Sequence, residues 1–267
     1  MGSRPVRQPA LGLLILLLAV ALWPATVRSA PCTLAAQHVG LTFPVEQVSA
    51  EWVCRLQPII DNHTTARKIG PITTALTKSL YIHLLDHPHV AAALINRLDL
   101  APYKAETREP GRYWGSDGEG TEGIVQLVYQ DHTSRIYYLE GSHQSRLLPN
   151  VTGKAVIFLR MAAVKGEGQS EAMESTIVSY TRLDSRVLAG MVSLLRPLVG
   201  SIVGKKLAKG IDVVNRLGLE MRQHPDRVMF EATDPPPLEA EEVDFLRQSL
   251  AGLPHANRPD QKGPDRK

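Results

Sequence analysis

The sequence lacks the short motifs that mark common catalytic and nucleotide-binding sites. It contains no Gly-x-Ser-x-Gly turn, no His-Glu-x-x-His helix, no Walker loop and no Gly-x-Gly-x-x-Gly turn before a helix. Gly118-Glu119-Gly120 lies in a turn-rich segment that leads into a predicted strand rather than a helix. We therefore expect no cofactor and no assigned catalytic residue.

Cysteine and aromatic residues are also scarce. Aromatic residues make up 5% of the chain, and the only cysteines are Cys32 and Cys54. In an oxidising compartment two nearby cysteines most simply form one disulfide. It would close a loop of about 20 residues and stabilise the protein by roughly 3 kcal/mol. A metal pair is the alternative, but no third cysteine supports it.

Long hydrophobic runs are absent except at the start of the chain. Residues 11–23 are apolar, follow Arg4 and Arg7, and precede the small residues around Ser29. This run is shorter than the roughly 20 residues that a membrane-spanning helix needs, and its flanks are those of a secretory signal peptide. We predict a signal peptide over residues 1–29 and an exported protein, periplasmic or extracellular; an uncleaved membrane anchor is the alternative.

The mature chain also lacks a charge excess. The whole chain has 30 basic and 27 acidic residues, and Arg4, Arg7 and Arg28 lie in the predicted signal peptide. The mature chain therefore has 30 − 3 = 27 basic residues against 27 acidic ones. A protein that wraps nucleic acid usually keeps a basic excess, so we expect no nucleic-acid partner.

Helices come first in the mature chain, then strands, then one long helix. Apolar spacing predicts helices over 73–85 and 88–98, separated at Asp86-His87-Pro88, and a short helix within 45–55. Residues 103–183 then alternate in five or six strands joined by short turns, which favours an antiparallel meander. Residues 185–222 have helical spacing throughout, and 237–250 predict a last helix.

This order resembles the helix-grip fold of the START/polyketide-cyclase (SRPBCC) superfamily. The similarity lies in Leu80-Tyr81-Ile82-His83-Leu84-Leu85-Asp86-His87-Pro88, the strand series of 103–183 and the helix from Ser185. It implies an α+β fold in which a curved antiparallel sheet wraps around the long helix. The superfamily's first strand has only 68–72 as its counterpart, shortened by Gly70-Pro71.

The domain organisation follows from this resemblance. We expect an N-terminal extension over 30–66, a helix-grip domain over 67–230, a C-terminal helix over 231–251 and a disordered tail over 252–267.

The resemblance further implies a cavity for a hydrophobic small molecule, such as a lipid or an isoprenoid. We expect the following residues to line its wall: Met191, Leu194, Leu198, Ile202, Val203, Tyr138, Phe158 and Arg160. Basic residues of the long helix suggest peripheral membrane contact through Lys205, Lys206 and Lys209, although a solvated helix face explains them adequately.

Two other functions stay open. A cavity enzyme of the cyclase or hydrolase kind would use Glu140 or His143 pointing inward, whereas a structural protein of the cell envelope would have a filled core. His83 and His87 have the spacing of two zinc ligands on one helix, but they need a third ligand such as Asp86. Because surface histidines around a helix break explain the pair, we expect no metal site.

Overall fold

The computed structural model describes residues 31–144, 150–166 and 169–253, and only the backbone of 185–200. The chain divides into two units, residues 1–32 and 33–267, and every element described below lies in the second. The predicted signal peptide and most of the predicted tail lie outside the described residues.

The second unit opens with a small N-terminal layer. It consists of the hairpin β1 (Gln37–His38) and β2 (Leu41–Thr42), the 3-10 turn η2 (Val45–Gln47) and helix α2 (Ala50–Asp61). Ser49 caps α2 because its side chain accepts a hydrogen bond from the Trp52 amide. Cys32 and Cys54 are both disulfide-bonded, which confirms the predicted disulfide.

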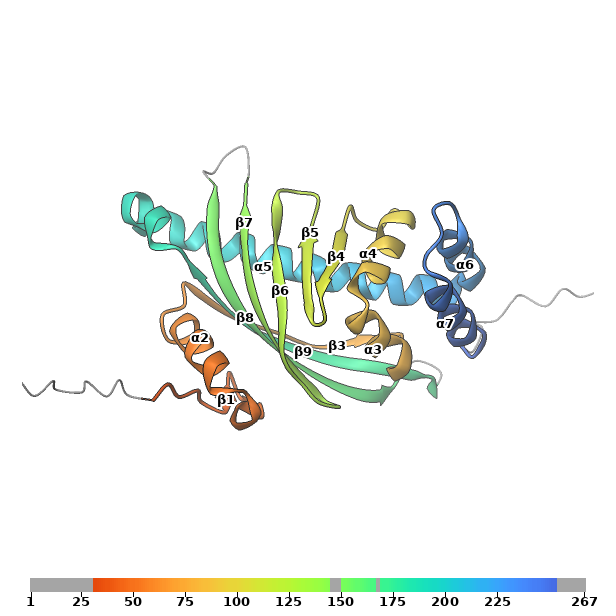
Figure 1. Cartoon of the computed structure of the whole chain (residues 1–267), viewed down its shortest axis with the longest axis horizontal. Helices are drawn as coiled ribbons and strands as arrows, with labels where there is room; N and C mark the ends of the chain where they lie inside the picture. Colours follow the sequence, from red (N-terminus) through yellow and green to blue (C-terminus); the bar gives the residue numbers. More distant parts are fainter. Residues whose placement is uncertain (1–30, 145–149, 167–168, 254–267) are drawn as a thin grey trace, which may run out of the picture. The chain divides into compact units, whose positions relative to one another are not determined.

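Seven strands form one antiparallel sheet in the order β3-β9-β8-β7-β6-β5-β4 (Figure 1). Their bounds are β3 Thr65–Thr74, β4 Lys104–Glu109, β5 Arg112–Ser116, β6 Thr121–Gln130, β7 Ser134–His143, β8 Val151–Lys165 and β9 Glu171–Leu183. Strands β4 to β9 follow the chain in order, as a meander. Pairing of β3 with β9 then places the first strand at the far edge.

The remaining helices lie in the connection between β3 and β4 and after β9. Between β3 and β4 lie α3 (Lys78–Asp86) and α4 (Pro88–Arg97), and after β9 come α5 (Ser185–Gln223), α6 (Pro225–Thr233) and α7 (Ala240–Ala251). Thr77 caps α3, and Pro88 occupies the first turn of α4. The first strand is ten residues long rather than short, because a register shift between Ile69 and Ile72 accommodates Gly70-Pro71.

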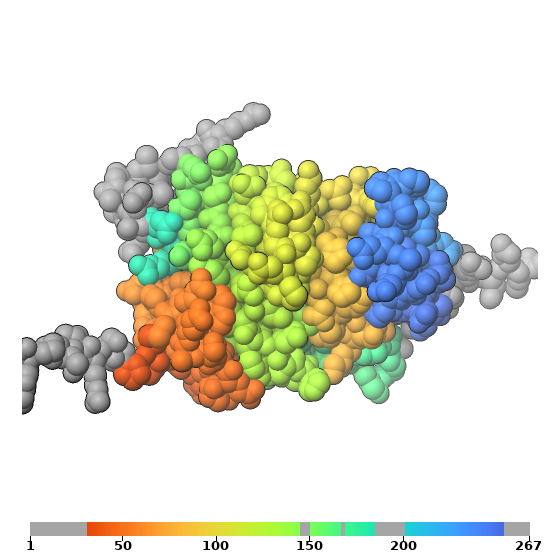
Figure 2. All heavy atoms as spheres, in the orientation of Figure 1, coloured from red at the N-terminus to blue at the C-terminus, as the bar shows by residue number. Residues whose placement is uncertain are grey.

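The two faces of the sheet carry separate apolar cores. On the face that we call inner, Leu159 and Met161 of β8 join a cluster with Leu217 and Met221 of α5. On the outer face, Phe158 and its neighbours pack with α2 and the segment before it. Figure 2 shows yellow to green strands at the surface between α2, in orange, and the blue C-terminal helices.

The fold is thus α+β, with a seven-stranded antiparallel sheet and helices, and it is consistent with a helix-grip fold. Helix α6 is absent from the sequence prediction. Within the described part of the chain, no helix combines the length and the hydropathy needed to span a bilayer.

Candidate functional site

The inner face of the sheet carries apolar side chains that belong to neither core. Residues paired across antiparallel strands point to the same face, and Tyr137, which packs against the inner core, pairs with Leu127 and Ile157. Two residues away on the same strands, Val125 pairs with Leu139, so these side chains also point to the inner face. The side chains of Val125, Leu127, Leu139 and Ile157 are half-buried. They form what we call the inner apolar band.

A row of four glycines borders this band. Gly115, Gly123, Gly141 and Gly153 are paired partners on β5, β6, β7 and β8. A Cβ on Gly123 would lie 2.5 Å from the Glu140 carbonyl oxygen, and one on Gly153 would lie 2.8 Å from the Arg182 carbonyl oxygen. Only glycine permits such close approach of neighbouring strands, which is how curvature is built into a sheet.

Helix α5 contacts strands near both edges of the sheet. At edge strand β3, the Thr74 hydroxyl donates to Asn215 Oδ1 over 2.6 Å. At the turn after β5, Lys206 Nζ lies 2.7 Å from both Asp117 Oδ2 and Glu119 Oε2, and Lys209 also contacts Glu119. Because β3 and β5 lie near opposite ends of the strand order, α5 spans the inner face between them.

We call Asp117, Glu119, Lys206 and Lys209 the α5 clasp. Burial would raise the pKa of Asp117, but hydrogen bonds from Lys206 and from backbone amides outweigh it and hold that pKa below its usual range. Hydrogen bonds from Lys206 and Lys209 lower the pKa of Glu119. Lys206 and Lys209, expected to face a membrane, are thus engaged in ion pairs within the protein, and Lys205 is exposed.

A buried arginine lies on the inner face, at the end of the strands opposite to the α5 clasp. The Arg135 side chain is 4% exposed, and its Nη1 lies 2.7 Å from Asp86 Oδ1 at the end of α3. Arg135 also donates to the Tyr137 hydroxyl over 3.4 Å, and the Tyr113 hydroxyl donates to the Asp86 carbonyl over 3.1 Å. Burial raises the pKa of Tyr137, and Arg135 opposes this rise. Among the described residues, Arg135 Nε has no hydrogen-bond partner.

The predicted cavity-wall residues separate into three groups. Ile202 and Val203 of α5 are half-buried. Met191, Leu194 and Leu198 lie outside the described side chains. Tyr138, Phe158 and Arg160 lie on the outer face, not on the inner one expected: the first two belong to the outer core, and Arg160 donates to the Thr42 carbonyl.

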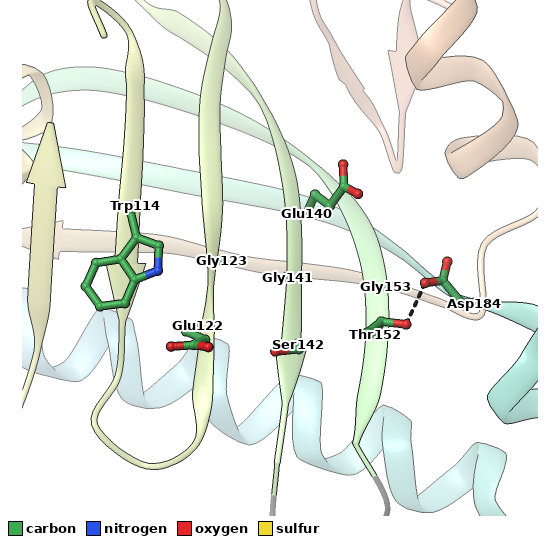
Figure 3. Close-up of a pocket in the computed structure, with 9 residues that line it drawn as sticks. All are labelled: Trp114, Glu122, Gly123, Glu140, Gly141, Ser142, Thr152, Gly153 and Asp184. Atoms are coloured by element: carbon green, nitrogen blue, oxygen red, sulfur yellow. Dashed lines mark hydrogen bonds between the residues drawn. The ribbon is translucent and has the colours of Figure 1, made fainter. Parts of the chain in front are cut away.

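The acid–base pair considered for a cavity enzyme is split between the two faces. Glu140 neighbours Tyr138 on the outer face and accepts a 2.7 Å hydrogen bond from its hydroxyl, whereas His143 has the opposite phase and contacts Thr121. Glu140 lines an outer pocket of about 340 Å³ (Figure 3). The other residues that line this pocket are Trp114, Glu122, Gly123, Gly141, Ser142, Thr152, Gly153 and Asp184. The structure therefore does not bring Glu140 and His143 together.

Comparison with known proteins gives structural similarities alone. No protein-family model and no curated protein matches the chain. XoxI from Bacillus cereus has a TM-score of 0.36 at 13% identity, over 60% of this chain and 98% of that one. Norcoclaurine synthase from Thalictrum flavum has a TM-score of 0.36 at 16% identity, over 72% and 99% of the two chains. The fold description therefore depends on the strand order and the position of α5.

Proposed function

We propose that this is an exported binding protein that holds an apolar small molecule between the inner apolar band and α5. The observation behind the proposal is the half-buried state of that band beneath a helix that contacts both ends of the sheet. Covering these apolar side chains with a ligand would favour binding by about 25 cal/mol for each Å² of apolar surface removed from water. Ligand sites are typically apolar with a few polar groups that set orientation.

The polar group in this proposal is the Tyr137 hydroxyl, which accepts from Arg135 and keeps its own proton for donation to a ligand. An oxygen-bearing end of the ligand, such as a carboxyl or hydroxyl group, would face it. Membrane docking through Lys206 and Lys209 is not part of the proposal, because both are occupied by the α5 clasp.

The test is a titration of the purified, disulfide-bonded protein with cis-parinaric acid, a fluorescent fatty acid. Leu139→Trp places an indole in the inner apolar band. Ile124→Trp is the matched control, because Ile124 is also half-buried but pairs with Glu140 on the outer face. We expect saturable binding that Leu139→Trp weakens at least about tenfold, equivalent to about 1.4 kcal/mol, and that Ile124→Trp leaves unchanged.

Two results would contradict the proposal. One is an absence of saturable binding by the unmodified protein, together with an organic-solvent extract that contains no apolar molecule by mass spectrometry. The other is equal weakening by both tryptophan variants when near-ultraviolet circular dichroism shows that both are folded. Weakening by Tyr137→Phe for fatty acid, but not for a hydrocarbon probe, would support the role of its hydroxyl.

A further inference from the structure

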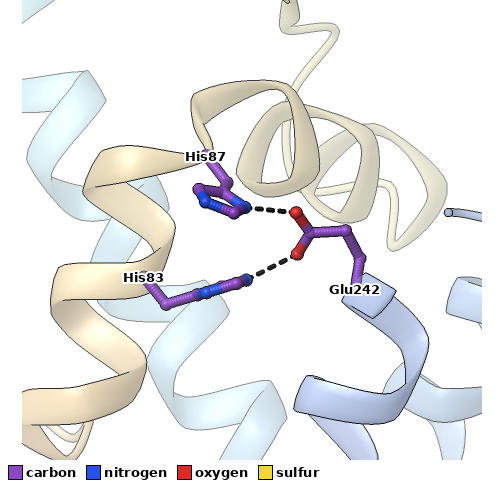
Figure 4. A group of neighbouring side chains, drawn as sticks. All are labelled: His83, His87 and Glu242. Carbon is purple, nitrogen blue, oxygen red and sulfur yellow. Dashed lines mark hydrogen bonds and ion pairs between the residues drawn. The ribbon is translucent and has the colours of Figure 1, made fainter. Parts of the chain in front are cut away.

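Two histidines and a glutamate converge between α3 and α7 (Figure 4). His83 and His87 are four residues apart at the end of α3, so they share one helix face. Glu242, in the first turn of α7, directs one carboxylate oxygen to each imidazole. His83 Nε2 lies 2.5 Å from Glu242 Oε2, and His87 Nδ1 contacts Oε1.

Nearby polar groups do not compete for this position. The carboxylate of Asp86 faces Arg135, and His89 Nδ1 contacts the Thr107 hydroxyl. The Phe245 ring stacks on His83 with 3.6 Å between ring centroids, so it shields that imidazole from water. The three donor atoms from His83, His87 and Glu242 therefore form a separate group.

The charge of this group points to a cation. Glu242 is 6% exposed, and among the described residues its ion-pair partners are the two imidazoles, neither of which is a permanent cation. A buried carboxylate is costly unless a positive charge compensates it. Two imidazole nitrogens with one carboxylate form a donor set that suits zinc, which often takes three protein ligands and a water.

We propose that His83 Nε2, His87 Nδ1 and the Glu242 carboxylate bind one Zn²⁺ ion. Bonds of about 2.0–2.1 Å in tetrahedral geometry separate ligand atoms by about 3.3 Å. The donor atoms lie within 4.8 Å of one another, so small side-chain rotations reach that separation. The His87 side chain is 40% exposed and leaves the fourth position open to water on its side. The bound ion would link α7 to α3.

The experiment strips metal from the full chain with a chelator, removes the chelator, adds Zn²⁺ and measures the zinc that the chain then binds. Bound zinc is counted by mass spectrometry of the metal, and affinity is measured by competition with a chromophoric chelator. We expect one ion per chain, at least about tenfold weaker binding by His87→Asn and by Glu242→Gln, and unchanged binding by the control His89→Asn. Zinc should raise the thermal midpoint of the unmodified protein and the control, but not that of His87→Asn.

The exposed position of His87 makes its variant the safer one if Glu242→Gln fails to fold. A wild-type protein that retains no stoichiometric zinc would overturn the site. So would equal weakening by His87→Asn and His89→Asn, since that would indicate adventitious binding at surface histidines. Either result would leave the trio as a hydrogen-bonded contact between α3 and α7 and would not bear on the proposed apolar ligand.

Discussion

Removal of Lys206 tests whether the α5 clasp holds the long helix across the sheet. Lys206→Met keeps most of the side-chain length but removes the charge that lies 2.7 Å from Asp117 and from Glu119. Fully exposed ion pairs contribute about 0.2–1 kcal/mol, and hydrogen bonds to charged groups about 1.5–3 kcal/mol. The side chains of Lys206 and Asp117 are 27% and 18% exposed. We therefore expect Lys206→Met to lower the free energy of unfolding by about 1–2 kcal/mol.

Lys205→Met is the matched control, because Lys205 is the adjacent residue, carries the same charge and is exposed. Urea unfolding should separate the two variants, and the thermal midpoint of Lys206→Met should fall by about 2–8 °C. The difference should shrink in 1 M salt, where the screening length is about 3 Å. Equal stability of the two variants at low salt would refute the clasp.

The same comparison has a pH dependence with a definite sign. The pKa of Asp117 is held below its ordinary value, so its ionised form favours the folded state. This contribution is fully present above the unfolded pKa and is lost as the pH falls through the folded one. The gap between Lys206→Met and wild type should therefore be constant from neutral pH down to about pH 5 and close in stronger acid.

Other substitutions test the curvature of the sheet and the disulfide. Gly123→Ala should cost about 1–3 kcal/mol in urea unfolding, because its Cβ would lie 2.5 Å from the Glu140 carbonyl oxygen. Gly210→Ala in α5 meets no atom within 4 Å and should instead stabilise by up to about 1 kcal/mol, so equal effects would contradict the glycine-row argument. Cys54→Ser should lower the free energy of unfolding by about 3 kcal/mol, and a stability unchanged by reduction of the Cys32–Cys54 bond would contradict this.

The order of elements could be predicted from the sequence because local signals dominate it. Short turns such as 131–133 join strands that pair directly, and the spacing of Leu217 and Met221 marks a helix face that is fully buried. The edge strand β3 was harder to predict, since Gly70-Pro71 interrupts its pattern while β9 still pairs on both sides of the interruption.

Which face of each strand points to α5 could not be predicted, because both faces are apolar. In β8, Val156 and Phe158 face the N-terminal layer, while Leu159 and Met161 face α5. Alternation therefore gives no single hydrophobic phase, and nothing in the sequence indicates that the N-terminal layer covers Tyr138 and Phe158, which are predicted in the cavity wall. A sheet that is covered on both faces loses the polar phase that normally identifies the outside.

The trio of His83, His87 and Glu242 could not be assembled from the sequence, for a different reason. The spacing of His83 and His87 indicates a shared helix face, but the acidic residue that the sequence places beside them is Asp86. Glu242 comes from a helix more than 150 residues away, and its acidic neighbours at the start of α7 have an independent explanation in the helix dipole. Only tertiary packing distinguishes the one buried glutamate of that turn from the exposed Glu241.

Two cores, one on each face, have a consequence for binding. The outer core fixes β7, β8 and β9 from one side, and the inner core fixes α5 through Val213, Leu217 and Met221, about one to three turns beyond the α5 clasp. Both therefore stabilise the fold without contributions from the inner apolar band. A region that is not needed for stability can remain half-packed. In a protein with a single core, by contrast, an unfilled cavity would lower the free energy of unfolding by about 24 cal/mol per Å³. Filling the band, as Leu139→Trp does, should then weaken ligand binding at least about tenfold while leaving the free energy of unfolding nearly unchanged or higher.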